Sequence, residues 1–373
     1  MSNTTTYNSE DKPYFENLYG LRFYAALAVF IFHAFSLFRE TWVGLEDNFL
    51  FQFITKFTSK GSLGVNLFFV LSGFLITYLL LCEKAKFGKV NALQFIKRRT
   101  LRIWPVYFLV VLFGFFVFPL LPYGKELVYN LGYYLGFLSN INEIQVGLKD
   151  SVNFMTPPWS VSVEEQFYVV LALLLGLFSF VNRKKLIWFY VAVILGSLTF
   201  RFFNLENERV IYFHTFSVMS DIAVGGILAI LAFSKSILPF FQNLSKLKIV
   251  SVYILGFALI LLKNVVFAGQ FQIIERLVLS FFFGFIILEQ VYANHSIFKV
   301  DKLKWVKKGG EISYGFYMYH VIVMYFVSKL FYSFGFNSIL DFVSLYLPLT
   351  LLINIILAYM SYRWFEQFFL RFK

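Results

Sequence analysis

Long apolar segments recur along the whole chain, and they restrict its fold more than any other feature. A segment of about 17 to 25 apolar residues is long enough to cross the hydrocarbon core of a bilayer as a helix. The chain is 59% hydrophobic and only 14% charged over 373 residues, so it is far more apolar than a soluble domain of this size. The sequence therefore predicts an all-α, polytopic membrane helix bundle with about ten transmembrane helices. The expected spans are Leu18–Phe38, Leu63–Leu81, Leu101–Leu121, Trp159–Phe180, Leu186–Phe203, Ile211–Phe233, Ile249–Leu262, Phe271–Val291, Ile312–Tyr332 and Phe342–Trp364.

Lysine and arginine gather in every second connection between these spans. Cytoplasmic loops of membrane proteins are enriched in both residues. The pattern therefore predicts that both chain termini face the cytoplasm, and it explains most of the net charge of +12 without a nucleic-acid partner. The basic clusters are Lys84–Arg99, Arg183–Lys185, Lys235–Lys248 and Lys299–Lys308, and the opposite connections are neutral, acidic or poor in charge.

A polar N-terminal segment precedes a single membrane domain. Residues 1–17 hold three acids against one lysine, so they lack the basic region of a cleavable signal peptide. We expect a cytoplasmic tail over 1–17, the membrane domain over 18–366 and a second cytoplasmic tail over 367–373. The single cysteine, Cys82, excludes an intrachain disulfide and a cysteine-rich metal site. The outer connection contains Leu127–Leu138, which is expected to form an interfacial or re-entrant helix over a site.

A histidine, His33, lies inside the first apolar span. An ionisable side chain in a membrane-spanning helix is costly unless the bundle interior satisfies it, so it usually persists for function. At about 1.5 Å per residue, His33 lies roughly 20 Å from the cytoplasmic end of this span, in the outer half of the membrane. The alternative is a histidine that only packs between helices.

Two adjacent carboxylates, Glu164 and Glu165, are expected at the same depth as His33, about 8 Å below the outer surface. Neighbouring side chains on a helix point about 100° apart, so at most one of them can face His33. A carboxylate bonded to one imidazole nitrogen raises the basicity of the other, which suits a general base for a hydroxyl group. The pair can also be a solvated helix start after Pro157 and Pro158, where acids are favoured.

Three arginines are expected together at the inner side of the bundle. Arg99 and Arg102 open the third span three residues apart on one helical face, and Arg22 lies near the inner end of the first span. Guanidinium groups match phosphate oxygens, so the cluster is a candidate site for a phosphorylated cytoplasmic donor. The alternative is positive-inside anchoring with the side chains extended toward the interface. The small residues of Ser62–Phe74 indicate close helix packing rather than a catalytic serine.

Taken in order along the chain, five motifs resemble the acyltransferase-3 family of bacterial integral-membrane acyltransferases. The likeness covers nearly the whole chain, and five motifs in sequence are specific where one would be weak. The motifs are Arg22 and His33 with ten residues between them, Gly64–Ile76, Arg99–Pro105, Trp159–Tyr168 and Ile312–His320.

This resemblance implies transfer of an acyl group, usually acetyl from cytoplasmic acetyl-CoA, to a hydroxyl of an extracytoplasmic or lipid-linked carbohydrate. It implies a multi-pass protein of the bacterial plasma or inner membrane, in contact with lipid, without a metal. His33 matches the catalytic histidine and Arg22 its motif partner. Arg99 and Arg102 match the pair that holds the CoA phosphates, and Glu164 with Glu165 matches the acidic motif.

Further polar residues inside the spans are candidates for the acceptor path, although any of them can be an interhelical hydrogen bond. They are Arg201, His214, Asp221 and His320. Some family members carry an extra extracytoplasmic domain after the last span, so a second acyl-carrying step here is expected to need a partner enzyme.

Two other classes stay open. A transporter of lipid-linked sugars would also bury charges, but it would often show repeats and interrupted helices, and the sequence indicates neither. A membrane glycosyltransferase would need acidic residues in an outer loop, for which Glu46–Asp47 is a candidate.

Overall fold

The computed structural model describes residues 15–37, 48–121, 128–147, 155–178, 182–336 and 338–372. Every regular element in these ranges is a helix, which confirms the all-α prediction. Eight helical segments among these residues are long and apolar enough to cross a membrane. Glu46 and Asp47, and Leu127 of the outer connection, lie outside the described residues.

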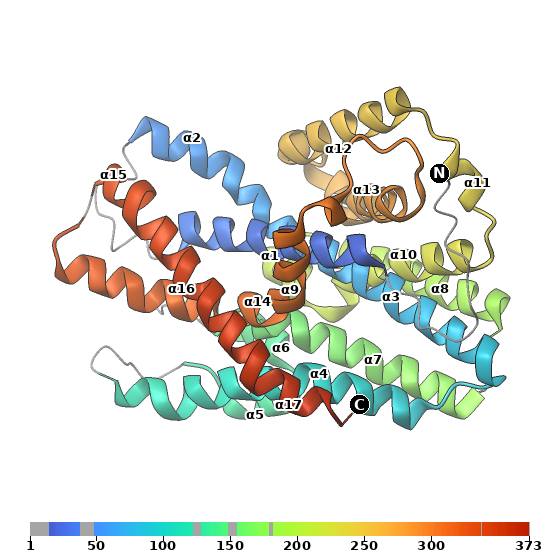
Figure 1. The fold of residues 1–373 in the computed structure, drawn as a ribbon, viewed down its shortest axis with the longest axis horizontal. Coiled ribbons are helices and arrows are strands. Elements are labelled where there is room, and N and C mark those ends of the chain that lie inside the picture. Colours follow the sequence, from blue (N-terminus) through green and yellow to red (C-terminus); the bar gives the residue numbers. More distant parts are fainter. Residues whose placement is uncertain are drawn as a thin grey trace.

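The helices in chain order are α1 (Glu16–Ser36), α2 (Phe49–Thr58), α3 (Gly64–Phe87), α4 (Ala92–Leu112), α5 (Leu131–Leu135), α6 (Ser139–Val146), α7 (Pro158–Phe178), α8 (Arg183–Phe203), α9 (Glu208–Phe213), α10 (Thr215–Phe233), α11 (Leu238–Gln242), α12 (Lys246–Val266), α13 (Gln272–Tyr292), α14 (Lys304–Ser333), α15 (Ile339–Asp341), α16 (Leu347–Met360) and α17 (Gln367–Leu370). Figure 1 shows α1 running through the middle of the bundle, with α14 and α16 on one side and α3, α8 and α10 on the other.

Most expected spans coincide with a helix to within a few residues. The seventh was too short, because α12 extends beyond the expected Ile249–Leu262 at both ends. Helices α7 and α14, which hold two further expected spans, are not among the eight, so the count of ten stays a prediction. At the chain ends, α1 begins at Glu16, inside the expected tail, and α17 continues the last helix beyond residue 366.

The third span begins earlier than predicted. Helix α4 starts at Ala92, where the side chain of Asn91 caps it by accepting a hydrogen bond from the Gln94 amide at 3.1 Å. Arg99 and Arg102 therefore lie two to three turns inside a regular helix rather than at its opening. A helix interior fixes the direction of both side chains.

The sixth span is interrupted, contrary to the sequence prediction that no helix is broken. His214 has an extended backbone between α9 and α10, and its ring Nδ1 accepts a hydrogen bond from the Phe216 amide at 3.2 Å. The carbonyls freed by the break are satisfied from elsewhere. Asn140 of α6 donates to Phe213 at 3.1 Å, and the hydroxyl of Ser217 donates to the carbonyl of Ile211.

Glycines bring the central helices into close contact. A Cβ at Gly310 of α14 would lie 2.1 Å from the carbonyl oxygen of Tyr19 in α1, and one at Gly64 of α3 would lie 2.4 Å from that of Ala25. Helix α1 is thus packed backbone to backbone on two sides. Gly73 of α3 makes the same kind of approach to α10, which confirms the close packing predicted for Ser62–Phe74.

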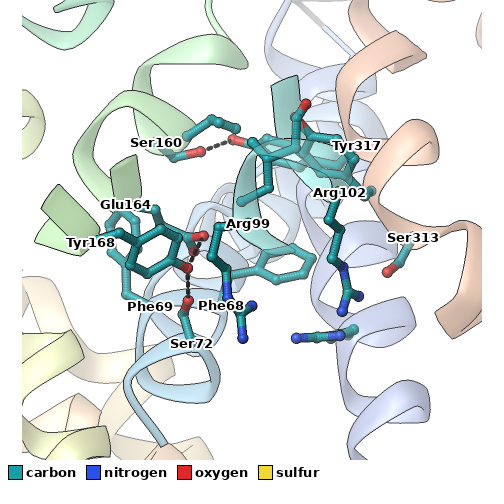
Figure 2. Close-up of a pocket in the computed structure, with 14 residues that line it drawn as sticks. Phe68, Phe69, Ser72, Arg99, Arg102, Ser160, Glu164, Tyr168, Ser313 and Tyr317 are labelled. Atoms are coloured by element: carbon teal, nitrogen blue, oxygen red, sulfur yellow. Dashed lines mark hydrogen bonds between the residues drawn. The ribbon is translucent and has the colours of Figure 1, made fainter. Parts of the chain in front are cut away.

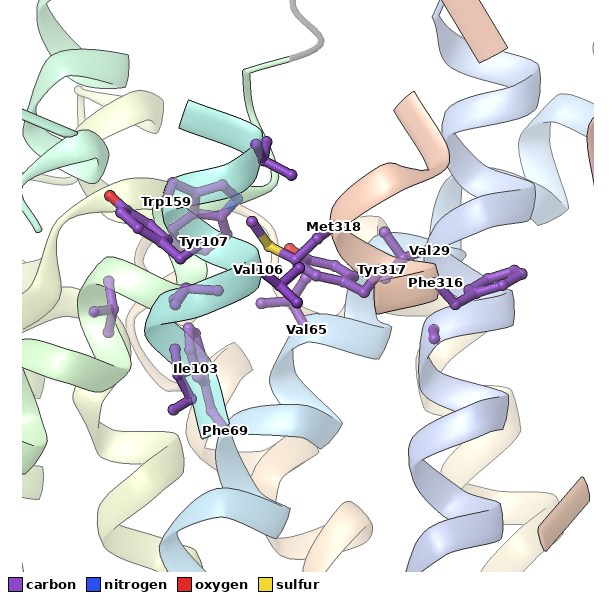
Figure 3. Close-up of a cluster of buried hydrophobic side chains, with 14 of the residues drawn as sticks. Val29, Val65, Phe69, Ile103, Val106, Tyr107, Trp159, Phe316, Tyr317 and Met318 are labelled. Carbon is purple, nitrogen blue, oxygen red and sulfur yellow. The ribbon is translucent and has the colours of Figure 1, made fainter. Parts of the chain in front are cut away.

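A continuous apolar core fixes these helices around α1. Figure 3 shows Val29 of α1, Val65 of α3, Val106 of α4 and Met318 of α14 converging in it. The two valines at 29 and 106 are 1% and 0% exposed. Since small changes of volume are felt in such a core, the polar side chains set among these residues are held in defined directions.

Short helices from the connection between α4 and α7 cover the start of α7. Ser139 of α6 lies 2.7 Å from Ser162 of α7, and Gln166 of α7 donates to the carbonyl of Phe137 at 2.7 Å. The hydroxyl of Tyr107 in α4 donates to the carbonyl of Tyr134 in α5 at 2.8 Å. The described part of this connection is therefore packed onto the bundle through polar contacts.

Candidate active site

A pocket opens between α1, α3, α4, α7 and α14, and four of its lining side chains are charged (Figure 2). It is lined by Arg22, Phe68, Phe69, Ser72, Arg99, Arg102, Ile103, Ser160, Val161, Glu164, Tyr168, Ser313, Tyr314 and Tyr317.

Three arginines from two helices converge on this pocket. Arg99 and Arg102 are three residues apart in α4, so they share a face, and Arg22 reaches the pocket from α1. Figure 2 shows the side chains of Arg99 and Arg102 extending toward the same part of the pocket. The guanidinium carbon of Arg99 lies 5.8 Å from the ring centroid of Tyr168. This contact fixes its direction and leaves its N–H groups available to an anion.

One carboxylate, that of Glu164, faces the arginines. It accepts a hydrogen bond from the hydroxyl of Tyr168 at 2.8 Å, and that hydroxyl is also hydrogen-bonded to Ser72 (Figure 2). Glu164 lies within electrostatic range of Arg22 and Arg99. Ser160, Glu164 and Tyr168 follow each other at intervals of four, so one face of α7 forms this wall.

The neighbouring carboxylate, Glu165, points away from the pocket. Its Oε2 accepts a hydrogen bond from the indole of Trp104 at 2.9 Å, and the residue is 6% exposed. The two glutamates thus have different neighbours, as the helical geometry predicts. Trp104 also packs against Phe137, with ring centroids 5.3 Å apart, so contacts inside the bundle hold its indole in place.

The side chain of His33 is hydrogen-bonded to a second histidine and not to a glutamate. Its Nδ1 lies 2.6 Å from Nε2 of His320 in α14, and among the described residues neither Glu164 nor Glu165 hydrogen-bonds to it. The predicted carboxylate partner is therefore wrong. The packing of α1 against α14 brings His320, expected only as a residue of the acceptor path, to this position.

The hydrogen bonds of the histidine pair define which nitrogen is basic. Nδ1 of His320 lies 2.5 Å from the carbonyl oxygen of Tyr317, and a carbonyl can only accept, so this nitrogen carries the proton. Nε2 of a neutral His320 must then accept from Nδ1 of His33. The lone pair of His33 is left on its Nε2, which is the form a general base requires.

Tyr317 connects the histidine pair to the pocket. Its side chain lines the pocket and its hydroxyl lies 2.9 Å from that of Ser160 (Figure 2). Its backbone carbonyl accepts a hydrogen bond from His320. Sequence reasoning missed Ser72, Ser160 and Tyr317. The spacing of Ser160, Glu164 and Tyr168 was the signal that was available for the α7 wall.

The other expected acceptor residues lie elsewhere. Asp221 of α10 forms an ion pair with Arg276 of α13, Arg201 of α8 lies within electrostatic range of both, and His214 stacks on Phe200. None of these residues lines the pocket. In the part of the chain that the structure describes, no group of three or more histidine, cysteine, aspartate or glutamate side chains is arranged to hold a metal ion.

Fold and site together define a membrane helix bundle with an arginine-lined pocket and a histidine pair that is hydrogen-bonded to the lining residue Tyr317. A model of the acyltransferase domain family matches residues 15–359, and the chain belongs to this family, acyltransferase-3.

Named relatives agree with this assignment. The O-acetyltransferase OatA of Staphylococcus aureus strain NCTC 8325 / PS 47 is 28% identical over an alignment that covers 95% of this chain and 57% of the relative. A putative O-acetyltransferase of Staphylococcus aureus strain COL is 26% identical, with the same coverage of both chains. The chain thus spans somewhat more than half the length of these curated relatives. No solved structure matches the chain.

Proposed function

We propose that this protein is a membrane O-acyltransferase that moves an acyl group, in the simplest case acetyl, from cytoplasmic acyl-CoA to a hydroxyl of a cell-surface or lipid-linked carbohydrate. Family membership and the names of the relatives support the reaction class. The observation that carries the proposal is the histidine pair, which leaves a basic nitrogen on His33 and is joined through Tyr317 to a pocket lined by three arginines.

Arg22, Arg99 and Arg102 are proposed to hold the phosphates of the donor. They outnumber the one carboxylate that lines the pocket, Glu164, so the pocket keeps an excess of positive charge. Guanidinium groups donate several hydrogen bonds in a fixed plane and suit phosphate oxygens. The connections rich in lysine and arginine are expected on the cytoplasmic side of the membrane, and the donor would enter from there.

His33 is proposed as the group that handles the proton. In direct transfer, its Nε2 takes the proton of the acceptor hydroxyl while that oxygen attacks the thioester carbonyl. The new C–O bond forms, the C–S bond breaks, and the sulfur leaves with a proton returned from His33. In the alternative, Nε2 itself attacks the thioester carbonyl, the C–S bond breaks and CoA leaves as its thiolate. The acceptor hydroxyl then attacks the acyl-histidine, the N–C bond breaks and the hydroxyl proton passes to the released Nε2.

The setting follows from the same proposal. The protein would be a multi-pass protein of the bacterial plasma or inner membrane, surrounded by lipid, with the carbohydrate reaching it from outside. A partner enzyme on the outer side is proposed for any further transfer of the acyl group.

Replacement of His33 tests the proposal. Purified protein in lipid nanodiscs would be assayed with acetyl-CoA for transfer and for slow hydrolysis of the thioester. We expect His33→Ala to lower both rates by about 10²- to 10⁴-fold, the usual contribution of a positioned general base. Binding of a non-hydrolysable CoA analogue should stay unchanged, because the arginines are intact.

The matched control is His295→Ala, which removes an exposed histidine outside the site. It should leave transfer, hydrolysis and analogue binding at the wild-type level. A folded, inserted His33→Ala protein with full transfer activity would contradict the assignment of His33.

A further inference from the structure

A buried carboxylate, that of Glu366, lies close to the pocket arginines but outside the residues that line the pocket. Glu366 ends the π-helical turn Ser361–Glu366, which continues α16, and it is 7% exposed. Arg363 and Trp364 of the same turn are exposed, so the turn directs this one acidic side chain into the bundle. Carboxylates are almost never buried to this extent without a partner.

The π-helical turn brings this carboxylate to a hydroxyl group. In a regular α-helix, side chains five residues apart point about 140° away from each other. A π-helical turn closes its hydrogen bonds between residues five apart, so it places such a pair on one face. The hydroxyl of Ser361 donates to Oε1 of Glu366 at 3.3 Å. Because its hydrogen is used there, the Ser361 oxygen accepts from the hydroxyl of Tyr319 in α14, which lies at 2.8 Å.

A glycine in α14 leaves room for the carboxylate. A Cβ at Gly315 would lie 3.1 Å from Oε1 of Glu366, closer than an ordinary van der Waals contact. Tyr314, the residue before this glycine, lines the pocket. The carboxylate of Glu366 is therefore fixed against the segment of α14 that forms part of the pocket wall.

The pocket arginines are divided between two carboxylates. Glu164 lies within electrostatic range of Arg22 and Arg99, whereas Glu366 lies within electrostatic range of Arg102. Helix α4, which holds Arg102, also contacts the π-helical turn and α17 directly (Figure 1). Each of the three arginines thus has a carboxylate in range, and the one near Arg102 comes from outside the pocket lining.

We propose that Glu366 is a positioning residue for donor binding, which attracts the guanidinium group of Arg102 and orients it for a phosphate of the donor. The inference rests on the proposed function, because it takes Arg102 as a ligand of the donor phosphates. An arginine side chain has several rotatable bonds, and holding it in place before the donor arrives lowers the entropy that binding costs. Since Glu366 does not line the pocket, it adds no negative charge to the surface that the donor contacts.

A double-mutant cycle tests the coupling between the two residues. The affinity for coenzyme A, which has no acyl group to transfer, would be measured by calorimetric titration of the purified protein in lipid nanodiscs. We expect Glu366→Gln to weaken binding by about three- to tenfold, as for coupled neighbouring groups, and to cause no further loss in Arg102→Ala. With acetyl-CoA as the substrate, KM should rise by the same factor and kcat should stay unchanged.

The matched control is Glu311→Gln, which removes an exposed carboxylate of α14 and should leave the affinity for coenzyme A unchanged. Equal losses for Glu366→Gln with and without Arg102 would overturn the proposal, and so would an unchanged affinity. Tighter binding in Glu366→Gln would also overturn it, because the carboxylate would then only repel the anionic donor.

If Glu366→Gln does not fold, Ser361→Ala is measured instead, because it removes the hydrogen bond to the carboxylate and keeps its charge. The affinity should then fall by about two- to threefold, within the net contribution of one hydrogen bond, and Ser361→Thr should restore it. Unchanged affinity in Ser361→Ala would refute the positioning role. An Arg102→Ala protein that binds coenzyme A normally would refute both this role and the proposed donor site, whereas absence of coupling alone would leave the donor site standing.

Discussion

Two groups of arginines in this bundle differ in what faces them. Arg22, Arg99 and Arg102 converge on a pocket where one carboxylate, that of Glu164, faces them among the residues that the structure describes. Arg201 and Arg276 lie in the interior around Asp221, and Arg276 is directly paired with it. The residue type is the same in both regions, but the surroundings assign different functions to it.

The two groups of arginines differ in how accessible they are to a ligand. Side chains that line a pocket keep N–H groups available for a ligand that enters and leaves, so their loss should reduce binding more than stability. Side chains enclosed between three helices have no such exchange, and their loss should reduce stability more than activity. Four predictions test this contrast and the site to which the pocket arginines belong.

The largest effect is expected for Asp221→Asn in the interior. The substitution leaves two buried guanidinium groups without a carboxylate, and breaking a buried ion pair in this way costs about 3–5 kcal/mol. The apparent unfolding temperature in detergent should fall sharply, while donor binding per folded molecule should be retained. Glu275→Gln breaks the ion pair between Glu275 and Lys263, which is more exposed than the pair of Asp221 with Arg276. This variant should have a much smaller effect on the same measurement. Equal losses in both variants would contradict the role given to burial.

The second prediction concerns the pocket. Arg99→Ala or Arg102→Ala should weaken binding of a CoA analogue by about 10- to 100-fold, since hydrogen bonds between charged groups contribute about 1.5–3 kcal/mol. The unfolding temperature should change little. Calorimetric titration in nanodiscs measures the affinity, and Arg371→Ala, an exposed arginine beyond α17, provides the control. Unchanged affinity in both pocket variants would return these arginines to a role in membrane anchoring.

The sequence predicted the helical class of the fold and the convergence of the pocket arginines for clear physical reasons. Apolar length defines a membrane-spanning helix, and a spacing of three residues places Arg99 and Arg102 on one face. The partner of His33 was predicted wrongly, because it depends on the rotation of α1 against α14. Backbone contacts such as that of Gly310 with Tyr19 set this rotation, and a single sequence does not reveal them.

The break at His214 escaped prediction for a related reason. Residues 208–219 contain neither proline nor glycine, so no local signal ends a helix there. The break is stabilised by distant side chains, above all by Asn140, which donates to the carbonyl of Phe213. Long-range polar contacts of this kind override the local helix propensity.

The third prediction tests the tautomer that His320 imposes on His33. His320→Phe keeps an aromatic ring in the core but removes the acceptor for Nδ1 of His33. Turnover should fall by about 10- to 100-fold, a typical effect for a partner that orients a functional histidine. Because the donor pocket is unaltered, affinity for the CoA analogue should be preserved. A variant with normal turnover would show that His320 only fills space between α1 and α14.

The smallest effect is expected for Tyr168→Phe, which removes only the hydroxyl shared by Glu164 and Ser72. The ring stays under Arg99, so the cation–π contact persists and the pocket keeps its shape. The hydroxyl acts on the donor only through Glu164, so its loss should cost about 0.5–1.5 kcal/mol of binding, the net contribution of a typical hydrogen bond, and donor affinity should fall by about two- to tenfold. Tyr168→Leu, which removes the ring as well, should weaken binding further, and the ratio between the two variants measures how much of the direction of Arg99 depends on the ring. Equal affinities for the two would show that the hydroxyl alone, through Glu164, positions the arginine.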